Sequence, residues 1–143
     1  MKISELDAML SKDMHVDEFK LMEASIQTPA LHTKWMKFLT EETFKLDVLQ
    51  QRMSRLKKAK WEYYAGKAPA KQYQKKPFSL KLTKGEIPMY IEADDDYQRL
   101  EMEIKKQTML TDRIGEAVKM VQFRHTNIRN AIDVIKINNG IVG

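Results

Sequence analysis

The sequence predicts a mainly α-helical fold with short N-terminal helices, two long coiled-coil-like helices, a small β-hairpin between them, and assembly into a homo-oligomer. Apolar residues recur at helical spacing over long stretches of the chain. The composition has 43% hydrophobic and 31% charged residues but only five glycines and four prolines, which is typical of long helices rather than of a disordered chain. At 143 residues the chain is long enough for one domain and short for two, so we expect a single domain over residues 1–143.

Two short amphipathic helices are expected at the N-terminus, over residues 4–11 and 17–25. Each has its apolar residues on one face and polar residues on the other. The apolar stripes consist of Ile3, Leu6 and Leu10 in the first helix, and of Phe19, Leu21 and Met22 in the second.

The first long helix is expected to begin at Thr28 and Pro29. A threonine side chain can accept hydrogen bonds from the free amides of the first turn, and proline is tolerated there because its missing N–H would be unpaired anyway. Gly66 is expected to end the helix, and Pro69 prevents its resumption. The helix would then span about 37 residues, or roughly 55 Å at 1.5 Å per residue. Its second half has a narrow seam with 3,4 spacing, made of Leu46, Leu49, Met53, Leu56 and Tyr63.

The segment between the long helices is expected to hold a loop and a β-hairpin. Residues 67–77 combine prolines with lysines and polar residues, which is typical of an exposed, mobile loop. Residues 78–82 and 87–92 are two short alternating runs on either side of Gly85, the pattern of a hairpin. Pro88 places the second strand at an edge, because proline cannot donate to a central ladder. Since a lone hairpin is marginally stable in water, it must lie against helices or a neighbouring subunit.

The last helix is expected to begin at the triple aspartate of Asp94, Asp95 and Asp96 and to end near Gly140. Free amides and the helix dipole favour negative charge at a helix N-terminus. The apolar positions that follow keep a 3,4 spacing for more than five heptads, which is typical of a coiled-coil-like seam. The seam positions are Tyr97, Leu100, Ile104, Gln107, Thr111, Ile114, Val118, Val121, His125, Ile128, Ile132 and Ile135.

Self-association is expected because two long helices with narrow stripes leave one side of each seam open in a chain of this size. Isoleucine at both seam positions near the C-terminus favours an assembly larger than a dimer. We therefore divide the predicted domain into an N-terminal helical part (1–66), a basic loop with the hairpin (67–93) and an oligomerisation helix (94–143). The predicted oligomerisation residues are Ile114, Val118, Val121, Ile128, Ile132 and Ile135.

The composition excludes several classes of protein. The absence of cysteine excludes disulfides, thiolate nucleophiles and most structural zinc sites. The three histidines have no metal-ligand spacing and no common catalytic motif is present, so we expect no enzyme, no metal and no other cofactor. No apolar run approaches the roughly 20 residues of a membrane span, and the N-terminus lacks the apolar core of a secretory signal. A cytoplasmic protein is therefore expected.

Positive charge is concentrated in one window of the chain. Residues 52–84 hold eleven of the twenty-five Lys and Arg residues and one acid, Glu62, which gives the window a formal charge of +10 against −5 for the remainder. Charge gathered in one segment predicts a polyanionic partner that binds there. The same window holds five of the twelve aromatic residues: Trp61, Tyr63, Tyr64, Tyr73 and Phe78.

Lysines and rings alternate in the densest part of this window, LKKAKWEYYAGK (residues 56–67). Lysines neutralise phosphates and release counterions, while rings stack on unstacked bases with roughly 1–3 kcal/mol per base. Because duplex DNA hides its base faces, single-stranded DNA is the better fit, and the absence of a base-reading motif predicts weak sequence dependence. The predicted DNA-binding residues are Lys57, Lys58, Lys60, Trp61, Tyr64, Lys67, Lys71, Lys75 and Lys76.

Two other functions fit parts of this pattern. A coiled-coil scaffold or adaptor without DNA-binding activity would carry the lysines as a solvated face or as a dock for an acidic protein, with Tyr63 packed in the seam. A small transcription or replication accessory would instead bind duplex DNA. The first predicts no affinity for oligonucleotides at physiological salt, and the second predicts a preference for duplex over a single strand of equal length.

The run LKKAKWEYYAGK resembles the hallmark segment of the UvsY family, the recombination mediators of T-even-type bacteriophages. The matching residues are Lys58-Ala59-Lys60 followed by Glu62-Tyr63-Tyr64-Ala65-Gly66, with a weaker likeness at Lys12-Asp13 and Lys34-Trp35. The sequence departs from the family in having Lys60 where arginine is usual, Trp61 where an aliphatic residue is usual, and Ala65 in place of serine. Lysine keeps the charge but lacks the planar fork of arginine.

The resemblance implies a heptameric ring that binds and wraps single-stranded DNA, with Lys58 and Lys60 tied to that binding. It also implies two protein partners, the phage single-strand binding protein, whose hold on DNA would be weakened, and the phage RecA-like recombinase, which would be loaded in its place. These activities serve phage recombination, repair and replication in the host cytoplasm. Repetition of modest DNA sites around a ring would give tight binding through effective concentration.

Overall fold

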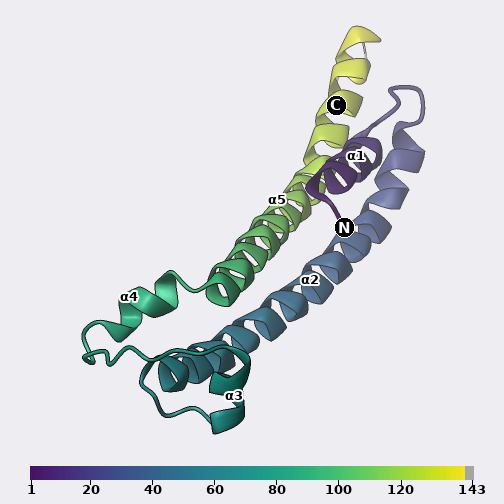
Figure 1. Ribbon diagram of the computed structural model, residues 1–143. Coiled ribbons are helices and arrows are strands. Elements are labelled where there is room, and N and C mark those ends of the chain that lie inside the picture. Colours follow the sequence, from purple (N-terminus) through teal and green to yellow (C-terminus); the bar gives the residue numbers. More distant parts are fainter. Residues whose placement is uncertain (141–143) are drawn as a thin grey trace. The chain divides into compact units, whose positions relative to one another are not determined.

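The computed structural model describes residues 1–140, and its regular structure is helical (Figure 1). Within these residues the helices follow in the order α1 (Ile3–Met14), α2 (Leu21–Tyr64), α3 (Ala70–Lys75), α4 (Ile87–Glu92) and α5 (Asp95–Asn138). No β-strand occurs in the described part of the chain. The mainly helical fold with two long helices is therefore confirmed, and the predicted β-hairpin is wrong.

The chain divides into two compact units, and α2 and α5 each run through both. The first unit consists of Met1–Thr43 and Met109–Gly143, and the second of Phe44–Thr108. The single domain over residues 1–143 stays a prediction. Residues 141–143, the end of the predicted oligomerisation helix, lie outside the described residues.

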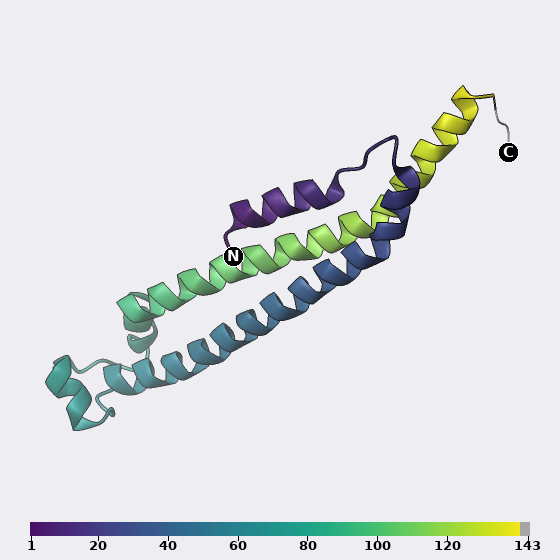
Figure 2. The same ribbon diagram turned by 90° about the vertical axis from the view of Figure 1, so that its right-hand side faces the viewer.

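The core of the first unit is closed by α1, which lies beside α2 and α5 (Figures 1 and 2). Leu6 of α1 and Trp35 of α2 are fully buried against one face of α5. A short amphipathic helix therefore covers the seam that sequence reasoning left open for another subunit. The residues that α5 contributes to this core are Leu110, Ile114, Ala117, Val118 and Val121.

The predicted oligomerisation residues consequently divide into two groups. Four of them, Ile114, Val118, Val121 and Ile128, are buried by the chain's own helices. The other two lie further along α5, where Ile132 is half-buried and Ile135 is exposed. Self-association through these residues stays a prediction, and only the second group is available on the surface of the subunit.

A shared carboxylate links α1 to α2. Asp13 Oδ2 accepts hydrogen bonds from Lys34 Nζ at 2.6 Å and from Trp35 Nε1 at 3.1 Å. The buried indole thus has its only donor satisfied, as a buried tryptophan requires. The two weaker sequence likenesses, at Lys12-Asp13 and Lys34-Trp35, meet in this one contact.

The first long helix begins at Leu21, seven residues before the predicted start. The Thr28 hydroxyl donates to the Ala24 carbonyl at 3.0 Å and therefore does not cap a helix. Pro29 lies inside α2. Arg124 of α5 donates to the same Ala24 carbonyl at 2.7 Å and to Thr28 Oγ1 at 2.8 Å, which binds this part of α2 to α5. The predicted separate helix over residues 17–25 is therefore wrong, because residues 17–20 form a turn and 21–25 are the beginning of α2.

The segment expected to hold a loop and a hairpin contains two short helices instead. Ala70–Lys75 forms α3 inside the predicted loop, and Ile87–Glu92 forms α4 in place of the second strand. Pro88 lies in the first turn of α4, where its missing N–H removes no helical bond. Ile87 is buried and Ile91 is half-buried at a spacing of four, so the helical period governs this run rather than alternation.

Candidate single-stranded DNA interface

α2 ends in a tight turn, which fixes the direction in which the chain continues into residues 67–77. Gly66 has a φ of +77°, a conformation that glycine adopts without a Cβ penalty. The Gly66 N–H donates to the Tyr63 carbonyl at 3.2 Å, and the Lys67 N–H donates to the Glu62 carbonyl at 2.8 Å. These two bonds are the Schellman pattern that satisfies free carbonyls at a helix C-terminus. The predicted stop at Gly66 is confirmed, and the turn carries Lys67 back over the last turns of α2.

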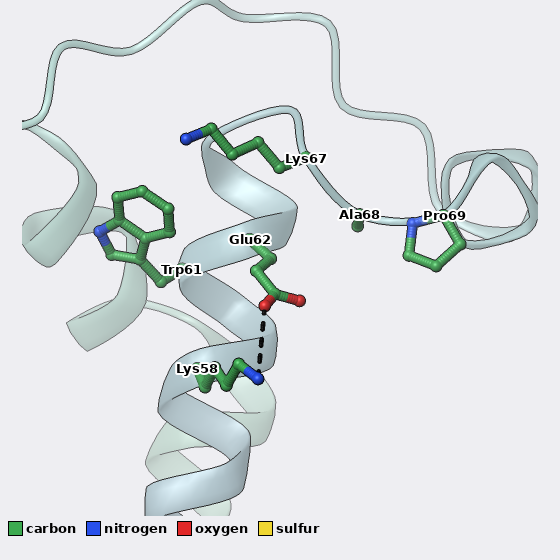
Figure 3. Close-up of a pocket in the computed structure, with 6 residues that line it drawn as sticks. All are labelled: Lys58, Trp61, Glu62, Lys67, Ala68 and Pro69. Carbon is green, nitrogen blue, oxygen red and sulfur yellow. Dashed lines mark ion pairs between the residues drawn. The ribbon is translucent and has the colours of Figure 1, made fainter.

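A pocket of about 690 Å³ lies against this turn (Figure 3). Lys67 Nζ is 5.1 Å from the centre of the Trp61 ring, within cation–π range. Lys58 lies about one helical turn before Trp61 on α2, and its ammonium is 3.9 Å from the Glu62 carboxylate in an exposed ion pair. Two ammonium groups and a flat ring therefore face one surface depression, which also has Ala68 and Pro69 in its wall. This is the chemistry that a phosphate and an unstacked base require.

An aromatic cluster packs beside the pocket. Tyr63 is 2% exposed and stacks on Tyr73 with ring centres 5.2 Å apart. Its hydroxyl donates to the Lys76 carbonyl at 2.8 Å, while the Tyr73 hydroxyl donates to the Tyr63 carbonyl at 2.7 Å. Tyr63 is therefore a core residue, which ties the segment after Gly66 to the end of α2. Phe78, Leu82 and Tyr90 pack against the same cluster.

Lys60 is buried, and its ammonium has two carboxylate partners at the start of α5. Lys60 Nζ lies 2.8 Å from Asp96 Oδ2 and 3.1 Å from Asp94 Oδ2, and the side chain is 9% exposed. Burial alone would lower the pKa of Lys60, but the hydrogen bonds and charges of the two aspartates outweigh it, so the pKa is raised. Lys60 thus belongs to the predicted DNA-binding set by sequence, yet the structure does not bring its charge to the pocket.

Asp94 joins this ion pair to the helix start and to Tyr64. Its Oδ1 accepts the N–H groups of Asp96 at 2.9 Å and Tyr97 at 3.1 Å, so the predicted aspartate cap of the last helix is confirmed. Its Oδ2 accepts the Tyr64 hydroxyl at 2.6 Å. Burial opposes ionisation, but the bonds from Tyr64, the Tyr97 amide and Lys60 outweigh it and lower the pKa of Asp94. Burial and the Asp94 carboxylate together raise the pKa of Tyr64.

The predicted DNA-binding residues therefore lie in three settings. Lys58, Trp61 and Lys67 line the pocket. Lys60 and Tyr64 are buried in the ion-pair network at the start of α5. The remaining lysines are exposed, Lys57 on α2, Lys71 and Lys75 on α3, and Lys76 directly after it.

No signal in the sequence indicated the burial of Lys60, because its carboxylate partners Asp94 and Asp96 lie more than thirty residues further along the chain. Within residues 1–140 the histidine and carboxylate side chains form no group of three or more that could hold a metal ion. None of the described helices is both long and apolar enough to cross a bilayer.

Comparison with known proteins gives two kinds of likeness. The sequence model of the family described as "Recombination, repair and ssDNA binding protein UvsY" matches residues 9–141. Comparison with the curated proteins gave no match.

Among solved structures, crystal forms of the bacteriophage T4 recombination mediator protein UvsY are similar in fold. Lattice type II has a TM-score of 0.85 at 21% identity and covers 97% of this chain and 98% of that chain. Lattice type IV has a TM-score of 0.84 at 19% identity and covers 96% and 99%. The family match spans nearly the whole chain, and the fold agrees with it over the same range. The chain therefore belongs to the UvsY family of recombination, repair and single-stranded DNA-binding proteins.

Proposed function

We propose that this protein is an oligomeric recombination mediator without enzymatic activity, which binds single-stranded DNA through the pocket formed by Lys58, Trp61 and Lys67. The observation that carries the proposal is the pairing of a half-buried indole with two ammonium groups around one depression, in a chain of this family. A base can stack on Trp61 while the ammonium groups hold the flanking phosphates. Exposed Lys57, Lys71, Lys75 and Lys76 extend the positive surface on either side.

In this proposal Lys60 and Tyr64 act on DNA indirectly. Their polar atoms are bonded to Asp94 and Asp96, so they hold the end of α2 in place rather than reach a strand. Lys60 is a positioning residue whose loss would weaken binding by moving Trp61 and Lys58. This assignment keeps the family's link between this position and DNA binding and gives it a different physical cause.

The mediator activity follows from the way several weak sites act together. In line with the family resemblance, we propose a ring of subunits, a heptamer, that wraps a single strand. The ring weakens the hold of the phage single-strand binding protein and helps load the phage RecA-like recombinase. Several modest sites on one ring give a high effective concentration of contacts. The single-strand binding protein and the recombinase would then exchange on DNA because they compete for the same phosphates.

The proposal is tested by titrating a fluorescent oligo-dT and a duplex of equal length at low and near-physiological salt, with the mass of the protein measured in the same buffers. We expect tight, salt-sensitive binding that prefers the single strand, by a discrete oligomer. Addition of the protein to oligo-dT covered by the single-strand binding protein should then shorten the lag of recombinase filament formation. An oligomer that ignores DNA would instead support the scaffold, and a preference for duplex would support the duplex-binding accessory.

A further inference from the structure

A second pocket in the same unit gathers three arginines. It has a volume of about 340 Å³, and its arginines are Arg52 and Arg55 of α2 and Arg99 of α5. The rest of its lining is Leu56, Asp96, Leu100 and Glu103. None of the three was among the predicted DNA-binding residues, because Arg99 lies outside the basic window and the first two precede its aromatic part. Arg99 comes next to Arg52 and Arg55 only in the folded chain.

The carboxylates beside these arginines hold them loosely. Arg52 Nη1 is 3.9 Å from Glu103 Oε2, and Arg99 Nη2 is 3.8 Å from Asp96 Oδ1. Both distances exceed hydrogen-bond length, so the guanidinium N–H groups remain free to donate elsewhere. The side chains are 57% and 76% exposed, respectively. The nearer bond of Asp96 goes to Lys60, at 2.8 Å through its other oxygen.

The arginine pocket and the Trp61 pocket have lining residues on neighbouring turns of α2. Arg55 precedes Lys58 by three residues on α2, a spacing that places the two side chains on one face of a helix. Their separation along the helix axis is about 4.5 Å at 1.5 Å per residue. One strand that leaves Trp61 past Lys58 therefore meets Arg55 on the next turn.

We propose that Arg52, Arg55 and Arg99 form a second phosphate-binding subsite for the strand whose base stacks on Trp61. Guanidinium groups with unused donors match the oxygens of a phosphodiester in a bidentate geometry. The position next to Lys58 favours a nucleic-acid backbone over an acidic peptide as the occupant. The inference rests on the proposed function, because it adds a subsite to the same DNA site.

The test uses the full-length chain with Arg55→Gln, Arg52→Gln or Arg99→Gln, and Arg129→Gln as the matched control. Arg129 is an exposed arginine of α5 in the other unit, so its replacement removes the same charge from the chain. Binding of labelled oligo-dT is followed against salt. For each subsite variant we expect the slope of log affinity against log salt to fall by about 0.7 per lost contact. The control variant should keep the wild-type slope.

A second variant separates direct contact from damage to the fold. Glu103→Gln removes the carboxylate that competes for Arg52, so it should raise the affinity for oligo-dT, by up to about fivefold, the upper range for one exposed ion pair. A merely structural arginine cluster predicts no larger gain than in Glu116→Gln, which removes an exposed carboxylate from the other unit. Circular dichroism and mass measurements on each variant establish that the folded oligomer persists.

Failure of the arginine subsite and failure of the proposed function would give different results. Lys58→Ala serves as the reference, since it alters only the Trp61 pocket. If wild-type protein has no affinity for oligo-dT, the proposed function fails and the subsite with it. If Lys58→Ala lowers the slope while the arginine variants and Glu103→Gln match wild type, only the subsite is overturned. Loss of binding to a polyglutamate peptide in the arginine variants, with oligo-dT binding unchanged, also overturns it.

Discussion

Lys60 donates a 2.8 Å hydrogen bond from its ammonium to Asp96, although the same residue occupies the position that the family resemblance ties to DNA binding. The pair joins the last turns of α2 to the first turn of α5 within the second unit. Asp94, the second carboxylate partner of Lys60, also caps the N-terminus of α5. The end of α2 and the start of the last helix are thus held by one set of charges.

Replacement of Lys60 by methionine should destabilise the protein by about 3 kcal/mol, the low end for breaking a buried ion pair. The low end applies because Asp94 keeps its bonds from Tyr64 and from two backbone amides. Chemical unfolding followed by circular dichroism measures the loss. Lys58→Met is the matched control, since the Lys58 ion pair is 81% exposed on the lysine side and should contribute little. Equal stability of the two variants would contradict the buried role of Lys60.

Stability should fall in acid below about pH 4 because of the two aspartates. The hydrogen bond from Lys60 lowers the pKa of Asp96 below its ordinary 3.8, and the pKa of Asp94 is lowered as well. A depressed pKa contributes stability that is present above the unfolded value and is lost as the pH falls through the folded one. Unfolding free energies measured over an acid series should therefore drop more steeply in wild type than in Lys60→Met.

The same network should weaken in strong alkali. The pKa of Lys60 is raised above its ordinary 10.5, so its contribution is present below that value and is lost as the pH rises through the folded pKa. Lys60→Met removes the titrating group. Its unfolding free energy should hence change less than that of wild type between about pH 9 and pH 12. A steeper alkaline loss in the variant would argue against the raised pKa.

Replacement of Trp61 by alanine should weaken oligo-dT binding by roughly 1–3 kcal/mol per stacked base. The wild-type protein should also lose tryptophan fluorescence when oligo-dT is added, and the variant should not. Trp35 cannot supply this signal, because it is fully buried in the other unit. Trp61→Phe keeps a ring and should retain most of the affinity. Unchanged binding by the alanine variant would remove stacking from the proposed function.

Two isoleucines of α5 should separate folding from self-association. Ile114 is fully buried, so Ile114→Ala should cost about 2–5 kcal/mol of stability. Ile135 is 40% exposed, so Ile135→Asp should leave the stability of the subunit near wild type and lower the mass of the assembly. Unfolding curves and the mass in solution measure the two effects. An intact assembly in Ile135→Asp would place the contact between subunits elsewhere.

The sequence predicted the elements that have strong local signals. The Gly66 stop and the Asp94 cap were both found, because each depends on one residue type that suits a helix end. The start of α2 was missed because Thr28 and Pro29 suit the first turn of a helix, whereas in the structure the Thr28 hydroxyl donates back to the Ala24 carbonyl and Pro29 lies inside α2. The hairpin was predicted wrongly because a six-residue run containing Ile87 and Ile91 fits either the strand or the helix period, and the structure has α4 there.

The candidate site was predicted by composition and only partly by position. The sequence placed lysines and rings in one segment, and Lys58, Trp61 and Lys67 do meet there. It could not show that Lys60 turns toward Asp94 and Asp96, because those partners are more than thirty residues away in the chain. Long-range pairing of charges is invisible to spacing rules.

The docking of α1 has a consequence for the motions of the protein. Only one of its side chains, Leu6, is among the fully buried residues, and its ion pairs join Asp13 to Lys34 of α2 and Asp7 to Arg113 of α5. The backbone bonds within α1 are local, so this helix can detach without unwinding α2 or α5. Amide hydrogens of α1 and acrylamide quenching of Trp35 should consequently report a local opening of lower free energy than global unfolding. Opening of α1 would therefore expose Trp35 and the face of α5 against which it packs, while α2 and α5 stay helical.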